Sequence, residues 1–131
     1  MLKDCPVIPY IPVSDLHRAR DFYEQVIGLV PTREAYGGVV YAGANGSSIF
    51  MYVSENAGTS KASQAFWQVT DLAAEMAELR SRGVVFEEYD FPGFKMVNGV
   101  ATGGGAMTAW FNDTEGNTMA LVQTLPTAED G

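Results

Sequence analysis

The spacing of hydrophobic residues changes several times along the chain, and each change predicts a new element of secondary structure. Residues 5–13 are rich in Val, Ile and Tyr but contain prolines at positions 6, 9 and 12. Because proline has no N–H to donate, this segment is predicted to be an edge strand or a strand at a seam. Ser14 and Asp15 then offer N-cap oxygens to a helix over 16–27, which Gly28 is placed to end.

Three strand patterns complete the first half of the chain. They are expected around 29–36, over 39–42 and over 49–53, and the last two flank a Gly-Ala-Asn-Gly turn at 43–46. Residues 55–63 are small and polar, which is typical of a linker. The first half is therefore predicted to be a βαβββ module.

The same order begins again after the linker. A strand is predicted over 64–69, and Asp71 is placed to cap a helix that ends at Gly83. The other expected segments are strands over 84–89, 107–111 and 118–123, an irregular loop over 90–105 and a turn over 113–117. The second half is thus predicted to repeat the order of the first.

A short sequence repeat supports this duplication. The Val-Ser-Asp-Leu sequence at 13–16 matches the Val-Thr-Asp-Leu sequence at 69–72. We predict a single domain over 1–131, built from one module at about 1–57 and another at about 62–125. Neither module is large enough to bury its sheet alone, so the two sheets are expected to pair edge to edge.

Composition and charge narrow the range of partners. Hydrophobic residues make up 47% of the chain, which indicates a globular protein. Sixteen Asp and Glu against eight Lys and Arg give a net charge of -8, and the cations are scattered from Lys3 to Lys95. This charge disfavours nucleic acids and anionic membranes, and it favours a ligand that is neutral, cationic or mostly apolar.

The cysteine content and the apolar runs bear on the compartment. Cys5 is the single cysteine, so an intramolecular disulfide and a CxxC metal site are excluded. No basic segment with an apolar stretch opens the sequence, and no apolar run approaches the roughly 18 residues of a membrane span. We therefore expect a cytoplasmic protein that does not enter membranes.

Two groups of residues carry a resemblance to a known superfamily. They are Ile-Pro-Val-Ser-Asp-Leu at 11–16 with Phe-Tyr at 22–23 and Gly-Leu at 28–29, and Trp-Phe-Asn-Asp-Thr-Glu-Gly-Asn at 110–117. With them the chain resembles the vicinal oxygen chelate superfamily, which includes glyoxalase I, bleomycin-resistance proteins and extradiol dioxygenases. The second group is similar to that superfamily's F-x-D-P-D-G-N turn, with Thr114 in place of the proline. The resemblance implies an α+β fold of two βαβββ modules whose paired mixed sheets form a concave cavity.

Enzymes of this superfamily hold a divalent metal with His, Gln or Glu side chains, and the resemblance assigns the equivalent positions in this chain. These positions are Ile8, Phe50 or Met51, Gln64 and Ala120. Of these side chains, only that of Gln64 has an oxygen donor, and a Met thioether suits soft metals. The single histidine, His17, is expected on the first helix, away from the site. The sequence therefore predicts no metal and no cofactor.

Alternation along the strands sorts residues between the cavity and the face that the helices cover. The residues expected to line the cavity and bind a ligand are Ile8, Tyr10, Phe50, Tyr52, Gln64, Phe66, Gln68, Thr108, Trp110 and Val122, with Phe94 and Met96 from the irregular loop. Trp67 is expected in the core instead. A mostly apolar and aromatic wall with a few polar groups is typical of pockets for planar small molecules.

These expectations favour one function and leave others open. The favoured function is a homodimer that sequesters a hydrophobic, partly planar aromatic natural product without a metal, as antibiotic-resistance proteins do. One alternative is a glyoxalase-like lyase or isomerase, or a dioxygenase-like enzyme, that uses Gln64, Glu87 or a tyrosine. Another is a scaffold with a vestigial pocket, in which the same side chains merely fill space. No catalytic residue is assigned.

Overall fold

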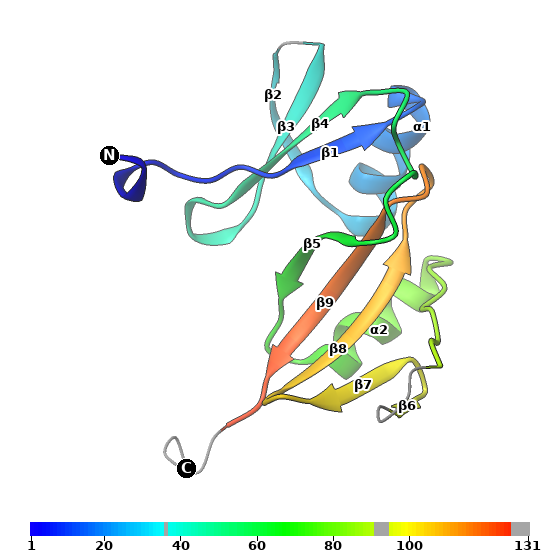
Figure 1. Cartoon of the computed structure of the whole chain (residues 1–131). Coiled ribbons are helices and arrows are strands. Elements are labelled where there is room, and N and C mark those ends of the chain that lie inside the picture. Colours follow the sequence, from blue (N-terminus) through cyan, green and yellow to red (C-terminus); the bar gives the residue numbers. More distant parts are fainter. Residues whose placement is uncertain (36, 91–94, 127–131) are drawn as a thin grey trace. The chain divides into compact units, whose positions relative to one another are not determined.

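The repeated order of strands and helix folds into two compact units, each with its own sheet (Figure 1). The computed structural model describes residues 1–35, 37–90 and 95–126. The first unit comprises Met1–Gln64 and the turn Asp113–Asn117, and the second comprises Ala65–Asn112 and the chain from Thr118 onward. The boundary therefore falls inside a strand, and one turn from the second half of the sequence belongs to the first unit.

The first sheet has the strand order β1-β4-β3-β2. Its strands are β1 (Tyr10–Val13), β2 (Val30–Ala35), β3 (Gly38–Ala42) and β4 (Ser48–Val53). β1 lies parallel to β4, whereas β3 is antiparallel to both of its neighbours. The predicted turn between β3 and β4 is confirmed, and it contains a short 3-10 helix, η3 (Ala44–Gly46).

The first strand is shorter than the predicted segment 5–13. A 3-10 helix, η1 (Leu2–Asp4), opens the chain, and β1 begins only at Tyr10. The physical reason is that Pro6 and Pro9 have no N–H for a ladder. The Pro9 carbonyl still accepts a hydrogen bond from the Phe50 N–H at 3.0 Å. Residues 1–8 are exposed and extend away from the first sheet (Figure 1).

The first helix begins and ends where the sequence predicts. Helix α1 (Leu16–Asp21) starts after Asp15, whose carboxylate accepts a hydrogen bond from the Arg18 N–H. It continues as a π-helical segment, η2 (Phe22–Ile27), and Gly28 ends it with a left-handed φ of 88°. The π-helical turns are a feature that the apolar spacing does not reveal.

One face of the first sheet packs against this helix and forms the core of the first unit. The buried side chains include Ile11, Val13, Ala19, Tyr23, Val39, Tyr41 and Met51. They alternate along β1, β3 and β4 with residues that point to the other face, as a half-buried sheet requires. The helix-free face is thereby left for other contacts.

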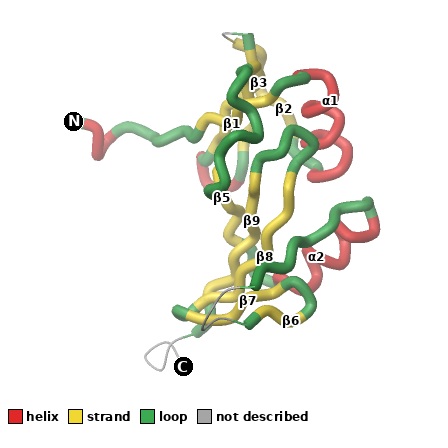
Figure 2. The backbone as a smooth tube through the Cα atoms, turned by 45° about the vertical axis from the view of Figure 1, so that its right-hand side comes forward, coloured by secondary structure: helices red, strands yellow, loops and turns green. Residues whose placement is uncertain are grey.

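The second sheet has the strand order β5-β9-β8-β7-β6. Its strands are β5 (Ser63–Gln68), β6 (Met96–Val97), β7 (Val100–Gly103), β8 (Ala106–Asn112) and β9 (Thr118–Thr124). Helix α2 (Leu72–Ser81), capped by the Asp71 carboxylate, lies on one face of this sheet (Figure 2). The predicted α+β class, with two mixed sheets, is confirmed.

One predicted strand of the second half is wrong. Residues 84–89 form only an isolated bridge between Phe86 and Phe111, and a hairpin of β6 and β7 occupies part of the segment predicted as an irregular loop. The hairpin forms because of the turn at Asn98 and Gly99, whose φ angles of 53° and 80° are both positive. An Asn-Gly turn with this geometry closes a two-residue hairpin.

Candidate functional site

Three aromatic rings gather on the helix-free face of the first sheet. The parallel register pairs Tyr10 with Phe50 and Pro12 with Tyr52, so these side chains share one face. The Tyr10 ring centroid lies 5.3 Å from that of Phe50 and 5.1 Å from that of Tyr52. The Phe50 and Tyr52 rings are nearly parallel, with 4° between their planes, and Tyr10 is 64% exposed. The face offers an accessible aromatic surface with two phenol hydroxyls.

Gly38 makes room for this aromatic surface. It is paired with Tyr52 across β3 and β4, and a Cβ placed on it would lie 2.8 Å from the Phe50 ring and would clash with the Met51 carbonyl. Any side chain at position 38 would therefore displace the Phe50 ring. The absence of a side chain at position 38 is therefore necessary for the Phe50 ring to occupy its place on this face.

The register of β4 distinguishes between Phe50 and Met51, the two residues that the sequence leaves open as the equivalent of a metal-ligand position. Met51 is fully buried on the helix-covered face, so the superfamily's ligand position on this strand falls on Phe50. Ile8 lies before β1 and is 43% exposed. The predicted residues Tyr10, Phe50 and Tyr52 are brought together, whereas Ile8 lies outside the strand.

A second aromatic face lies on the sheet of the second unit, opposite α2. Its register pairs Trp110 with Ala120 and Thr108 with Val122, which places all four on the face opposite the buried Phe111 and Leu121. Met96 belongs to the same face, because it pairs with Ala101, which in turn pairs with Thr108. These predicted residues therefore share one side of the second sheet.

β5 contributes its alternate residues in the predicted way. The Trp67 ring stacks on the Phe111 ring, with centroids 6.2 Å apart and 17° between the planes. Phe66 and Gln68 therefore point to the other side, and Phe66 is 62% exposed. The Gln68 amide donates to the Thr124 hydroxyl at 3.5 Å. Trp67 thus packs on the helix-covered face, but it is half-buried and not part of the core as predicted.

Tyr89 is a member of this second face that the prediction missed. Its ring meets Trp110 edge to face, with centroids 5.6 Å apart and 70° between the planes. Burial, and then the charge of Glu87, raise the pKa of the Tyr89 hydroxyl above its usual value. The alternation along 84–89 could have assigned Tyr89 to this face, because Val84 and Phe86 are buried on the helix-covered side and the odd-numbered residues point the other way.

The remaining predicted residues are Gln64 and Phe94. The Gln64 amide donates to the Ala62 carbonyl at 3.1 Å, so this amide has a partner in its own chain. Phe94 lies outside the described residues.

The positions that would carry metal ligands do not fit a divalent ion. Ile8, Phe50 and Ala120 offer only carbon, and Gln64 alone offers an amide oxygen, which cannot complete a coordination shell. In the part of the chain that the structure describes, no three His, Cys, Asp or Glu side chains are grouped to hold a metal. His17 is 91% exposed on α1 and pairs with Asp21.

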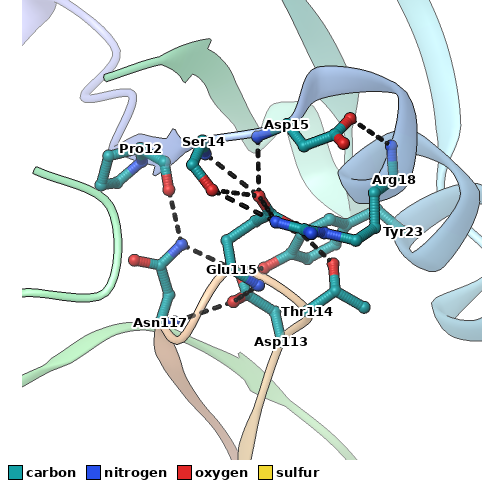
Figure 3. Close-up of polar contacts among 9 residues, drawn as sticks. All are labelled: Pro12, Ser14, Asp15, Arg18, Tyr23, Asp113, Thr114, Glu115 and Asn117. Carbon is teal, nitrogen blue, oxygen red and sulfur yellow. Dashed lines mark hydrogen bonds and ion pairs between the residues drawn. The ribbon is translucent and has the colours of Figure 1, made fainter. Parts of the chain in front are cut away.

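An extensive polar network surrounds the turn Asp113–Asn117 (Figure 3). The Glu115 carboxylate accepts hydrogen bonds from the backbone and hydroxyl of Ser14, the backbone of Asp15, the Arg18 guanidinium and the Thr114 hydroxyl. Burial opposes ionisation of Glu115, but these donors outweigh it and lower the pKa from 4.5 to about 2. The side chain is fully buried and remains charged.

Asp113 is equally saturated with donors. One carboxylate oxygen accepts from the backbone of Glu115 and Asn117, and the other accepts from the Tyr23 hydroxyl at 2.5 Å and the Asn117 amide at 2.9 Å. The Asn117 amide also donates to the Pro12 carbonyl at 2.7 Å. Both acidic groups of this turn are fully committed to structure, so neither is available as a general acid or base.

Among the described residues, two hollows, one in each unit, lie on the helix side of the sheets. One of about 410 Å³ is bordered by Leu16, Arg20, Glu34 and Val39, and one of about 190 Å³ by Leu72, Met76, Arg80 and Met107. Arg20 at the first hollow is neutralised by Glu24 and Glu34. Neither hollow contains a predicted site residue, and the aromatic faces carry the more specific chemistry.

The family model described as Glyoxalase/Bleomycin resistance protein/Dioxygenase superfamily matches residues 7–121. The chain belongs to this superfamily. The resemblance expected from the sequence is thereby confirmed. The curated proteins contain no significant match.

Solved structures share the fold. TnmS3, an antibiotic binding protein from Streptomyces sp. CB03234, is 21% identical with a TM-score of 0.66, over 92% of this chain and 98% of that one. A glyoxalase/bleomycin resistance protein from Catenulispora acidiphila is 19% identical with a TM-score of 0.68, over 91% and 97%. UcmS2 is 16% identical with a TM-score of 0.68, over 88% and 96%. At these identities the likeness shows the fold alone.

Proposed function

We propose that this protein binds a planar, largely apolar small molecule on its aromatic sheet faces and sequesters it chemically unchanged. The observation that carries the proposal is the pair of aromatic surfaces on the helix-free faces, one with Tyr10, Phe50 and Tyr52 and one with Tyr89 and Trp110. Aromatic rings attract planar ligands by offset or edge-to-face stacking, worth about 0.5–1.5 kcal/mol per pair beyond burial.

The polar groups beside these rings are suited to orientation rather than proton transfer. The hydroxyls of Tyr10 and Tyr52, the Thr108 hydroxyl and the Gln68 amide can exchange hydrogen bonds with a ligand oxygen. An amide does not titrate near neutral pH and cannot serve as a general base. TnmS3 is described as antibiotic binding, and its shared fold supports a capture role here.

The assembly and the compartment complete the proposal. Leu2 and Val7 in the exposed N-terminal segment, and Val30 and Val53 on the first sheet, are each more than half exposed. Apolar surface of this kind favours a symmetric homodimer.

The described residues contain no helix that has the length and apolar character to cross a membrane. A cytoplasmic location would suit capture of a drug that has entered the cell.

A thermal-shift screen with planar aromatic natural products tests the proposal. Binding raises the melting temperature in proportion to the logarithm of ligand concentration above Kd. Anthraquinones are the first probes, and a saturated steroid of similar size is the control for shape. We expect stabilisation by the planar compounds only, with the recovered compound unchanged in mass. Conversion of the probe would favour the enzyme alternative, and no stabilisation by any planar compound would contradict the proposal.

A further inference from the structure

We infer that the Trp110 face of the second sheet contains a subsite for a positively charged group of the ligand, formed by the Glu87 carboxylate with the Tyr89 and Trp110 rings. This inference rests on the function proposed above, because it adds a charge preference to one of the same binding faces. It identifies the ligand class as planar aromatic cations.

Two observations place the Glu87 carboxylate on the Trp110 face. The Phe86–Phe111 bridge and the bond from the Glu87 N–H to the Trp110 carbonyl at 2.8 Å align this segment with β8. Phe86 points to the helix-covered side, so Glu87 points to the other. Independently, the Asn112 amide donates to the Glu87 Oε1 at 3.1 Å, and Asn112 alternates with Phe111 onto the Trp110 face.

The neighbouring rings have the polarity that a cation seeks. The faces of Trp and Tyr carry the negative part of the ring quadrupole, and Trp gives the strongest attraction. The edge-to-face arrangement directs the edge of one ring at the face of the other, so the two rings form a corner. The charge of Glu87 acts on the Tyr89 hydroxyl, which agrees with a carboxylate close to this corner.

The chain itself supplies no counter-charge for Glu87 within the described ranges. The ion pairs found there involve the N-terminus, Lys3, His17, Arg18, Arg20 and Arg82, and none of them reaches Glu87. Asn112 is neutral and donates to only one of the two carboxylate oxygens. The carboxylate of the half-buried residue Glu87 is therefore available to a cationic ligand, and the net charge of -8 would steer such a ligand toward the protein.

The test uses two probes that differ in charge but hardly in shape. Acridine is uncharged in mildly alkaline buffer, whereas 10-methylacridinium carries a permanent positive charge on the same ring system. Affinities are measured by fluorescence titration against the wild-type protein, Glu87→Gln, Glu87→Asp and the control Glu75→Gln. Glu75 is exposed on α2, on the opposite face of the same sheet, so its substitution changes the net charge equally.

We expect the wild-type protein to bind 10-methylacridinium about tenfold more tightly than acridine. Glu87→Gln should lower this ratio severalfold and leave only the preference that the rings supply, while Glu75→Gln should keep the ratio and Glu87→Asp should retain most of it. A ratio near one in the wild-type protein, or an unchanged ratio in Glu87→Gln, overturns the inference. If acridine binds in that case, the proposed function stands. If neither probe binds, the proposed function and this inference both fail. The wild-type ratio decides the matter even if Glu87→Gln does not fold.

Discussion

The guanidinium of Arg18 and the fully buried carboxylate of Glu115 meet at 2.8 Å, although 97 positions of sequence separate them. Arg18 lies on the first turns of α1, and Glu115 lies in the turn between β8 and β9. The same carboxylate accepts hydrogen bonds from the backbone N–H groups of Ser14 and Asp15, which precede the helix. A single side chain thereby fixes the start of α1.

Replacing this carboxylate should destabilise the protein strongly. Glu115→Gln keeps the size of the side chain but removes the charge that Arg18 and the backbone donors require. The lowering of the Glu115 pKa from 4.5 to about 2 corresponds to roughly 3 kcal/mol of unfolding free energy at neutral pH. Urea denaturation measures this loss, with the exposed Glu55→Gln as the control. An equal and small effect of both substitutions would contradict the role assigned to Glu115.

The same pKa predicts the pH dependence of stability. Because the folded pKa of Glu115 lies below the unfolded value, its contribution is fully present above about pH 4.5 and is lost as the pH falls to about 2. The difference in unfolding free energy between the wild-type protein and Glu115→Gln should therefore be constant at neutral pH and shrink through this window. A difference that persists undiminished at pH 2 would show that the charge is not its source.

The two tryptophans should separate binding from stability. Trp110→Ala removes the ring that meets Tyr89 and should weaken capture of a planar ligand by ~2 kcal/mol or more. Trp67→Ala removes a half-buried ring stacked on Phe111 and should lower the unfolding free energy by about 3 kcal/mol. Ligand titration and thermal unfolding of both variants check the division. The opposite division would mean that the proposed binding face is the wrong one.

A side chain at Gly99 should destabilise the hairpin of β6 and β7 more than one at Gly104. This residue has a φ of 80°, and an added Cβ would lie 3.2 Å from the Arg80 side chain and 3.3 Å from the Phe86 Cβ. Gly104 has a similar φ of 62° but open space around it. Gly104→Ala should cost about 1–2 kcal/mol from backbone strain, and Gly99→Ala about 1 kcal/mol more. Thermal unfolding of the two variants gives the comparison.

Sedimentation should reveal a homodimer. The side chains of Leu2, Val7, Val30 and Val53 are each more than half exposed in the first unit, and a homodimer would cover such apolar surface. At micromolar concentration we expect a mass of about twice the 14.1 kDa of one chain. The mass of a single chain would refute the dimer and leave the binding faces unaffected.

Much of the fold follows from local patterns in the sequence. Apolar spacing and the caps at Asp15 and Asp71 place both helices, and period-two alternation assigns Tyr10 and Trp110 to the helix-free faces. The strand predicted over 84–89 is wrong, because this segment meets β8 at a single bridge between Phe86 and Phe111 and does not continue into a ladder. The Asn-Gly signal at 98–99 was present, within a glycine-rich segment that favours a loop.

The part of the molecule that sequence reasoning misses depends on long-range pairing. Ser14 and Asp15 are recognisable as helix caps, and the turn 113–117 is recognisable by its composition, but no local pattern says that Glu115 reaches them. The partner of the Gln64 amide is likewise set by the bend of the chain at Ala62. Contacts of this kind depend on how distant segments of the chain pack together, and local sequence patterns do not specify that packing.

The membership of the turn Asp113–Asn117 in the first unit has a consequence for synthesis of the protein. A ribosome adds Glu115 about 50 residues after it has synthesised residue 64, and at about 5–20 residues per second this takes several seconds. During that interval the N–H groups of Ser14 and Asp15 and the charge of Arg18 have no native carboxylate. The first unit can therefore complete the hydrogen bonds at the start of α1 only after the turn Asp113–Asn117 has been synthesised.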